Sequence, residues 1–98
     1  MILVRDVFRL RFGKAKEAKA LWKEGAQIES KLGHEPSRCM VDLTGQYYTF
    51  VMESTYRDLA SFEQDMQKAM SSPEFSAWYQ RFVPLVESGH REIFTLLD

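Results

Sequence analysis

The chain has 98 residues, of which 45% are hydrophobic and 28% are charged, and its formal net charge is −1. This composition excludes a disordered chain and predicts one folded domain over residues 1–98. The near-zero net charge gives no electrostatic reason to expect binding to nucleic acid or to a membrane surface. Cys39 is the only cysteine, and no apolar run is long enough for a bilayer span or a secretion signal. We therefore expect a cytoplasmic protein.

The first half of the chain predicts a strand, a helix and a loop. Residues 2–12 alternate between apolar and polar positions, which is typical of a strand. Residues 14–32 have apolar side chains at helical spacing, and Gly33 suits the left-handed residue that ends many helices. His34 is expected to lie exposed in the loop that follows, because Pro36 disfavours a helix there.

The middle of the chain predicts a β-hairpin that leads into a second helical region. Residues 38–43 and 47–53 are rich in β-branched and aromatic residues, and the short turn 44–46 joins them. Thr55 and Asp58 have the spacing of a capping box, a pattern that starts helices.

Two signals divide the second helical region, and a last strand follows it. The apolar face that begins at Leu59 is interrupted at Ser72 and Pro73, which suit the N-cap and the first position of a new helix. Pro84 ends this helix, and residues 90–97 predict the final strand.

The order strand, helix, strand, strand, helix, strand is typical of the ferredoxin-like α+β fold. This fold has a four-stranded antiparallel sheet with both helical segments on one face and nothing on the other. The alternation puts these residues on the open face: Leu3, Val7, Met40, Tyr47, Val51, Ile93 and Leu97, with Arg5, Arg9, Glu53 and Arg91 among them. Such a face is too apolar to be left exposed to water. We therefore expect a homodimer that packs sheet to sheet about a two-fold axis. A monomer that tolerates scattered apolar residues is the alternative.

Three segments resemble the dimeric α+β barrel superfamily, and within it the NIPSNAP-like branch. They are LVRDVFRLRFGK, the Tyr-Thr-Phe-Val-Met strand that runs into Tyr56-Arg57-Asp58-Leu59, and the Ser-Pro-Glu-Phe helix with the Gly-His-Arg-Glu-Ile-Phe strand. The resemblance spans nearly the whole chain and implies a dimeric α+β barrel. Relatives of this fold include antibiotic-biosynthesis monooxygenases, and the resemblance implies a ligand site between sheet and helices. The haem-degrading branch is discounted, because its Asn-Trp-His constellation needs an asparagine and this sequence has none.

Asp6 is the first candidate for a catalytic residue, because it interrupts an otherwise apolar strand face. A buried carboxylate needs a partner, so Asp6 is expected either in a ligand cavity, as a base or anchor, or in a salt bridge to the last strand. A strand bulge that turns it outward is a third possibility. His90 and Glu92 share the predicted parity of Asp6, so an Asp6–His90 proton relay is expected. His90 as a solvated strand end is the alternative.

Four aromatic residues are candidate ligand-binding walls: Trp22, Tyr48, Phe62 and Trp78. The abundance of large aromatic side chains suits an apolar cavity, although aromatic residues at helical spacing also form ordinary cores.

The sequence predicts neither a metal nor a cofactor. His34, His90 and Cys39 lack the spacing of a metal site. Cys39 has the parity of a core-facing strand residue, so it is expected to be a small buried hydrophobe rather than a nucleophile.

Three functions remain open from the sequence. The first is an enzyme of the cofactor-independent oxygenase or isomerase kind, which acts on a small apolar molecule in a cavity under the helices. The second is a non-catalytic dimeric module that binds a ligand or a partner. The third is an anion-binding module around Arg9 and Lys14 at the start of the first helix.

Overall fold

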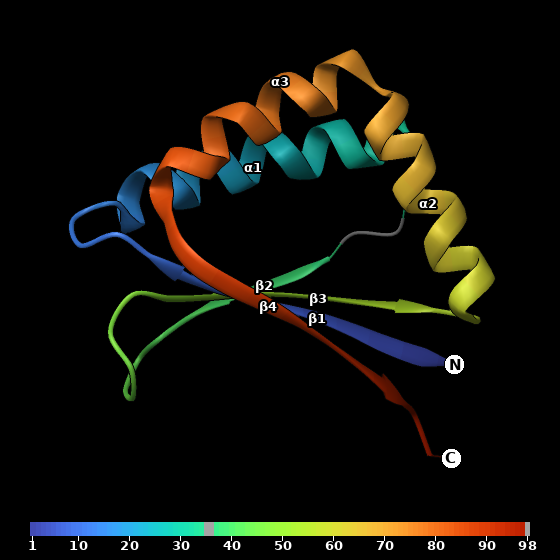
Figure 1. Cartoon of the computed structure of the whole chain (residues 1–98), viewed down its shortest axis with the longest axis horizontal. Helices are drawn as coiled ribbons and strands as arrows, with labels where there is room; N and C mark the ends of the chain where they lie inside the picture. Colours follow the sequence, from blue (N-terminus) through green and yellow to red (C-terminus); the bar gives the residue numbers. More distant parts are fainter. Residues whose placement is uncertain (35–36, 98) are drawn as a thin grey trace.

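The computed structural model describes residues 1–34 and 37–97 of the chain (Figure 1). The elements are β1 (Ile2–Leu10), α1 (Ala15–Lys31), β2 (Arg38–Val41), β3 (Thr49–Tyr56), α2 (Leu59–Ser71), α3 (Pro73–Phe82) and β4 (Val86–Thr95), with a 3-10 turn at Val83–Leu85. The four strands form one antiparallel sheet in the order β2-β3-β1-β4. The predicted ferredoxin-like α+β fold is confirmed. None of the described helices is long and apolar enough to cross a membrane.

Local signals set several of the helix ends. Ser72 caps α3 by accepting a hydrogen bond from Phe75 N at 3.2 Å, and Pro73 is the first helical residue, as predicted. Gly33 follows α1 with a φ of 80°, also as predicted. The cap of α2 is Asp58, which accepts from Ser61 N, so the capping box expected to begin at Thr55 is wrong.

The start of the last strand and the loop after α1 are the remaining connections. The last strand begins at Val86, four residues before the predicted start at His90, because the chain enters the sheet directly from the turn after α3. The predicted loop of residues 34–37 includes Glu35 and Pro36, which lie outside the described residues.

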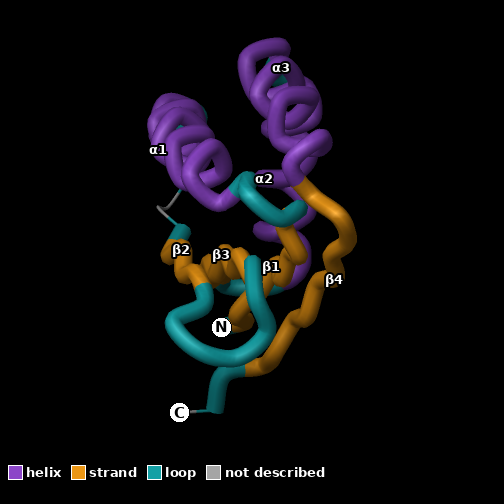
Figure 2. Tube along the Cα trace, turned by 90° about the vertical axis from the view of Figure 1, so that its left-hand side faces the viewer, coloured by secondary structure: helices purple, strands orange, loops and turns teal. Residues whose placement is uncertain are grey.

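The molecule has two layers, as Figure 2 shows: helices on one side of the sheet and an open face on the other. α1 and α3 lie side by side over the sheet, and α2 connects the end of β3 to α3 (Figure 1). The helix layer is therefore formed by α1 and α3, which pack on each other, and by α2, which packs on α3 and β3.

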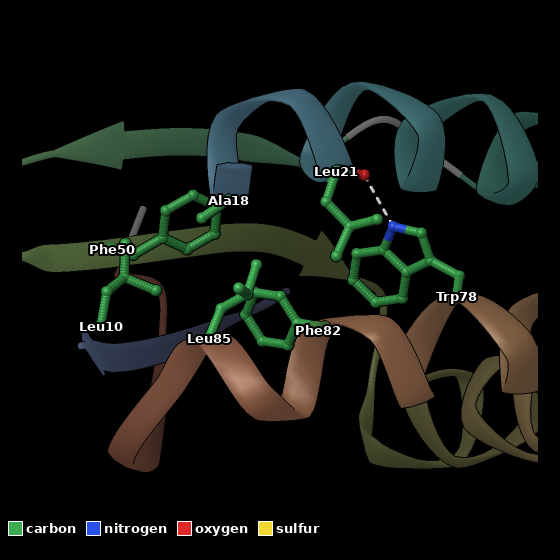
Figure 3. Packing of buried hydrophobic residues seen from close by; sticks show 7 residues of the cluster. All are labelled: Leu10, Ala18, Leu21, Phe50, Trp78, Phe82 and Leu85. Carbon is green, nitrogen blue, oxygen red and sulfur yellow. Dashed lines mark hydrogen bonds between the residues drawn. The ribbon is translucent and has the colours of Figure 1, made fainter. Parts of the chain in front are cut away.

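The core fills the space between the sheet, the first half of α1 and the end of α3. Figure 3 shows its buried members: Leu10, Ala18, Leu21, Phe50, Trp78, Phe82 and Leu85. The ring of Phe82 stacks on the indole of Trp78 at 5.3 Å between centroids and meets Phe8 edge-on at 5.1 Å. The close packing of these rings joins β1 to α3.

Trp78 also joins α3 to α1 through a buried hydrogen bond. Its indole N–H donates to the carbonyl oxygen of Leu21 at 2.6 Å (Figure 3). The indole reaches this carbonyl across Gly25, where an added Cβ would lie only 2.8 Å from Cε2 of Trp78. Gly25 is therefore needed for the close approach of the two helices, despite its low helix propensity.

The open face of the sheet carries an apolar centre and paired charges. Val7 lies between Val51 on β3 and His90 on β4, and Met40 lies beyond Val51. Glu53 also lies on this face, yet only 5% of it is exposed, because two arginines cover it.

Both oxygens of the Glu53 carboxylate are held by these arginines. Arg5 Nε donates to Oε2 at 2.8 Å, and Arg38 donates to Oε1 at 3.0 Å. These hydrogen bonds hold the pKa of Glu53 below its ordinary value. The open face thus presents paired charges beside its apolar side chains.

We predict that Gly25→Ala lowers the free energy of unfolding by about 1–2 kcal/mol, because the clash with the indole outweighs the gain in helix propensity. Urea denaturation measures the change. In a Trp78→Phe background the clashing indole atoms are gone, so the same Gly25→Ala change should be neutral or stabilising. An equal loss in both backgrounds would show that the indole is not the cause.

Candidate functional site

A cavity of about 520 Å³ lies between the sheet and the helices. The cavity lies between the core and α2. Residues of all three helices and of β1, β3 and β4 line it. Its apolar walls are formed by Val4, Phe8, Met52, Phe62, Met66, Ala69, Phe75, Trp78, Phe82 and Val86. Met70 and Tyr79 also line it and are exposed, so they mark its rim where α2 meets α3. A volume of this size suits a small organic ligand.

Asp6 lies on the helix-facing side of β1 and lines the cavity. Its cross-strand partner on β4 is Arg91, whose Nε donates to Oδ1 of Asp6 at 2.6 Å. The guanidinium of Arg91 also lies 5.1 Å from the ring centroid of Phe62. The salt bridge that the sequence left open as an alternative is therefore the one formed.

His90 does not reach Asp6, so the expected proximity of the pair is wrong. His90 borders the cavity but pairs with Val7, and cross-strand partners share a face. Its Nε2 lies 3.3 Å from Oε2 of Glu92 on the open face. β4 has the opposite parity to the one predicted: Arg91 and Ile93 face the helices, while His90 and Glu92 face away.

Two further carboxylates line the cavity beside Asp6. Glu29 belongs to the last turn of α1, and Asp65 lies near the middle of α2. Burial raises the pKa of Glu29 above its ordinary value, and the negative charges of Asp6 and Asp65 raise it further. The cavity therefore has one acidic end whose charge the described residues do not fully neutralise.

Tyr56 lies near the same three carboxylates, and their charges affect its pKa. It lines the cavity from the end of β3, and its ring meets that of Phe62 edge-on at 5.3 Å. Burial, followed by the charges of Asp65, Glu29 and Asp6, raises the pKa of Tyr56 to about 12. Its hydroxyl is therefore a proton-bearing group at neutral pH, able to donate a hydrogen bond into the cavity.

The side chain of His34 is buried at the acidic end, so the predicted exposure of this residue is wrong. Only 8% of its side chain is exposed, and its Nε2 lies 3.9 Å from Oδ1 of Asp65. Within residues 1–34 and 37–97 that nitrogen has no hydrogen-bond partner. The backbone N–H of His34 donates to the carbonyl of Glu29 at 3.0 Å, which ties the residue to the end of α1.

The four predicted ligand-binding aromatics divide into two pairs. Phe62 and Trp78 line the cavity. Trp22 and Tyr48 are absent from its lining and pack against the core cluster instead. Tyr48 adopts a left-handed φ of 61° before β3 and contacts Phe12 edge-on at 4.9 Å.

Cys39 is half-buried on β2 and packs against the core cluster. Burial raises the pKa of its thiol to about 11, so the thiol stays protonated at neutral pH and is not an activated nucleophile. Among the described residues, no three His, Cys, Asp or Glu side chains are grouped so that they could hold a metal ion.

Sequence reasoning missed Glu29, Asp65, His34, Tyr56 and Arg91. A signal existed for the two carboxylates. Glu29 continues the helical stripe of Trp22 and Gly25, and Asp65 lies between Phe62 and Ala69 on the stripe of α2. Each is a charge on an apolar stripe, the same irregularity that singled out Asp6.

The fold belongs to a class whose members share this sheet and helix layer. Similar solved structures include one named as an antibiotic biosynthesis monooxygenase, with a TM-score of 0.77, 12% identity and full coverage of both chains. A NIPSNAP family protein from Agrobacterium tumefaciens has a TM-score of 0.92 and 22% identity over 99% of this chain and 86% of its own. An uncharacterised NIPSNAP domain protein from Burkholderia xenovorans has a TM-score of 0.87 and 19% identity, with coverage of 99% and 95%.

The family model described as NIPSNAP matches residues 5–98. The chain belongs to the NIPSNAP family, and the predicted resemblance is confirmed. No curated protein matches it.

We predict that Glu29→Gln stabilises the protein at neutral pH. A carboxyl whose pKa is raised on folding costs stability once the pH exceeds the value of the unfolded chain, because ionisation is then harder in the folded state. Glutamine removes that cost, so the variant should melt at a higher temperature than the wild type at pH 7. The difference should shrink as the pH falls and vanish below the ordinary pKa of 4.5, where both states are protonated.

Glu63→Gln, at an exposed position of α2, is the matched control for this experiment. It should show no such pH-dependent gain. A Glu29→Gln variant less stable than the wild type at pH 7 would contradict the unfavourable burial of this carboxylate.

Proposed function

We propose that this NIPSNAP family chain binds a small, largely apolar molecule in the cavity between sheet and helices. The observation that carries this proposal is the cavity of about 520 Å³, with aromatic and methionine walls and polar groups at one end. Apolar walls with a few convergent polar groups are the usual form of a small-molecule site. The non-catalytic ligand-binding module, the second function left open by the sequence, is therefore the favoured one.

Binding is favoured over transformation because the proposed acid–base pair is not assembled. An acid–base pair needs both of its groups within reach of the same substrate. One oxygen of Asp6 accepts from Arg91 at 2.6 Å, and His90 lies on the opposite face. The likeness to an antibiotic biosynthesis monooxygenase, at 12% identity, concerns the fold alone. No oxygenase or isomerase step is included in the proposal.

The proposed functional unit is a homodimer that packs through the open sheet face. The apolar side chains of this face are Leu3, Val7, Met40, Val51 and Phe94. The charge of Glu53 is already paired with Arg5 and Arg38 within the chain, which lowers the cost of removing this face from water. A cytosolic location stays a prediction, based on the single cysteine of the sequence.

The binding proposal predicts that the neutral fluorophore N-phenyl-1-naphthylamine enters the cavity and brightens. Ala69→Phe places a ring into the cavity from α2, so it should weaken binding of this probe at least about tenfold. Ala77→Phe adds the same ring at an exposed position of α3 outside the cavity lining and should bind like the wild type. Equal binding by all three proteins would place the probe elsewhere and contradict the proposal.

The dimer proposal predicts a single species of twice the chain mass in size-exclusion chromatography with light scattering. Val51→Arg places a charge at the apolar centre of the open face and should produce a folded monomer, as checked by circular dichroism. Gln80→Arg, at an exposed position on α3, should leave the dimer intact. A wild-type monomer at micromolar concentration would overturn the proposal.

A further inference from the structure

The acidic end of the cavity has more negative than positive charge. Among the described residues, three carboxylates line it, those of Asp6, Glu29 and Asp65, against one guanidinium, that of Arg91. The guanidinium is engaged by Asp6 at 2.6 Å, so Glu29 and Asp65 are left without an arginine or lysine partner among the described residues. Partly buried carboxylates of this kind favour a cation beside them.

The backbone of α1 adds to this negative potential. Glu29 lies in the last turn of α1, and the carboxyl end of a helix carries a partial negative charge that favours cations. The last basic residue of the helix, Lys31, lies 3.5 Å from Glu74 and is mostly exposed, so it does not serve the cavity.

His34 gives an independent indication that this end accepts a polar group of a ligand. Its side chain is more than nine-tenths buried, it lines the cavity, and its Nε2 has no partner within the described residues. The distance of 3.9 Å from Nε2 of His34 to Oδ1 of Asp65 is too long for a hydrogen bond. A buried polar atom without a partner costs about 1–3 kcal/mol, a cost that a ligand donor placed between the two residues would remove.

We propose that the ligand is an amphipathic amine: a small apolar or aromatic body with one ammonium group. The ammonium has three N–H donors, and the acidic end offers three acceptors in Glu29, Asp65 and Nε2 of His34. The apolar body lies against Phe75, Trp78 and the other walls, whose ring faces also favour a nearby cation. Asp6 stays paired with Arg91 and closes the site towards β4. This inference rests on the proposed binding function.

The test compares three probes that share a naphthalene body and differ in charge: 2-(1-naphthyl)ethylamine, 2-(1-naphthyl)ethanol and 1-naphthylacetate. Isothermal titration calorimetry at pH 7 measures their affinities for the full chain. The amine should bind at least about tenfold more tightly than the alcohol, and the acetate should bind most weakly.

Variants locate the preference at the acidic end. Glu29→Gln and Asp65→Asn should each reduce the amine affinity about tenfold and the alcohol affinity much less, so the preference for the amine should shrink. Glu63→Gln, outside the cavity lining, should change neither. Two different cavity variants keep the test usable if one of them does not fold.

The outcomes separate this inference from the function on which it rests. Alcohol and acetate binding as tight as that of the amine would overturn the amine assignment and leave the binding function standing. An amine preference unchanged in both cavity variants would also overturn it. Failure of all three probes to bind would overturn the amine assignment and the proposed function together.

Discussion

The hydrogen bond from the Trp78 indole to the carbonyl of Leu21 sets the geometry of the helix layer. It fixes α3 against α1 at one point, and Gly25 permits the close approach. On one side of this point Phe82 and Leu85 complete a packed core. On the other side α3 turns through Ser72 into α2, and the space beneath is the cavity. The core and the cavity thus lie next to each other between the helices and the sheet. Trp78 belongs to the core cluster and also lines the cavity.

Much of the fold could be predicted because each element carries its own local signal. Alternation marked β1, helical spacing marked α1, and Ser72 with Pro73 marked the start of α3. The orientation of β4 was harder to predict, because neither of its faces is clearly apolar. Arg91 and Ile93 lie on one face, and His90 and Glu92 lie on the other. Without a clean apolar face, the sequence pattern does not distinguish the two possible orientations of the strand. The cross-strand pairing of Asp6 with Arg91, and of Val7 with His90, selects the orientation that was not predicted.

The candidate site was predictable only in part for a related reason. Asp6 stood out because strand alternation is easy to read, whereas Glu29 and Asp65 lie on helical stripes wide enough to include polar residues. His34 carries no periodic signal at all, and its place beside Asp65 of α2 follows only from the tertiary structure. Trp22 and Tyr48 show the converse: aromatic character predicts burial but does not distinguish a core from a cavity wall.

β4 also has a consequence for the behaviour of the chain in concentrated solution. It is an edge strand of ten residues. The run 93–97 covers its last three residues and the two that follow, and its apolar side chains are exposed: Ile93, Phe94, Leu96 and Leu97. Edge strands of this kind can recruit further strands and seed intermolecular β-sheet. Glu87, Arg91 and Glu92 place charges on the preceding part of the edge, but no charge interrupts the run itself. The segment that completes the sheet is therefore also the one most able to start aggregation.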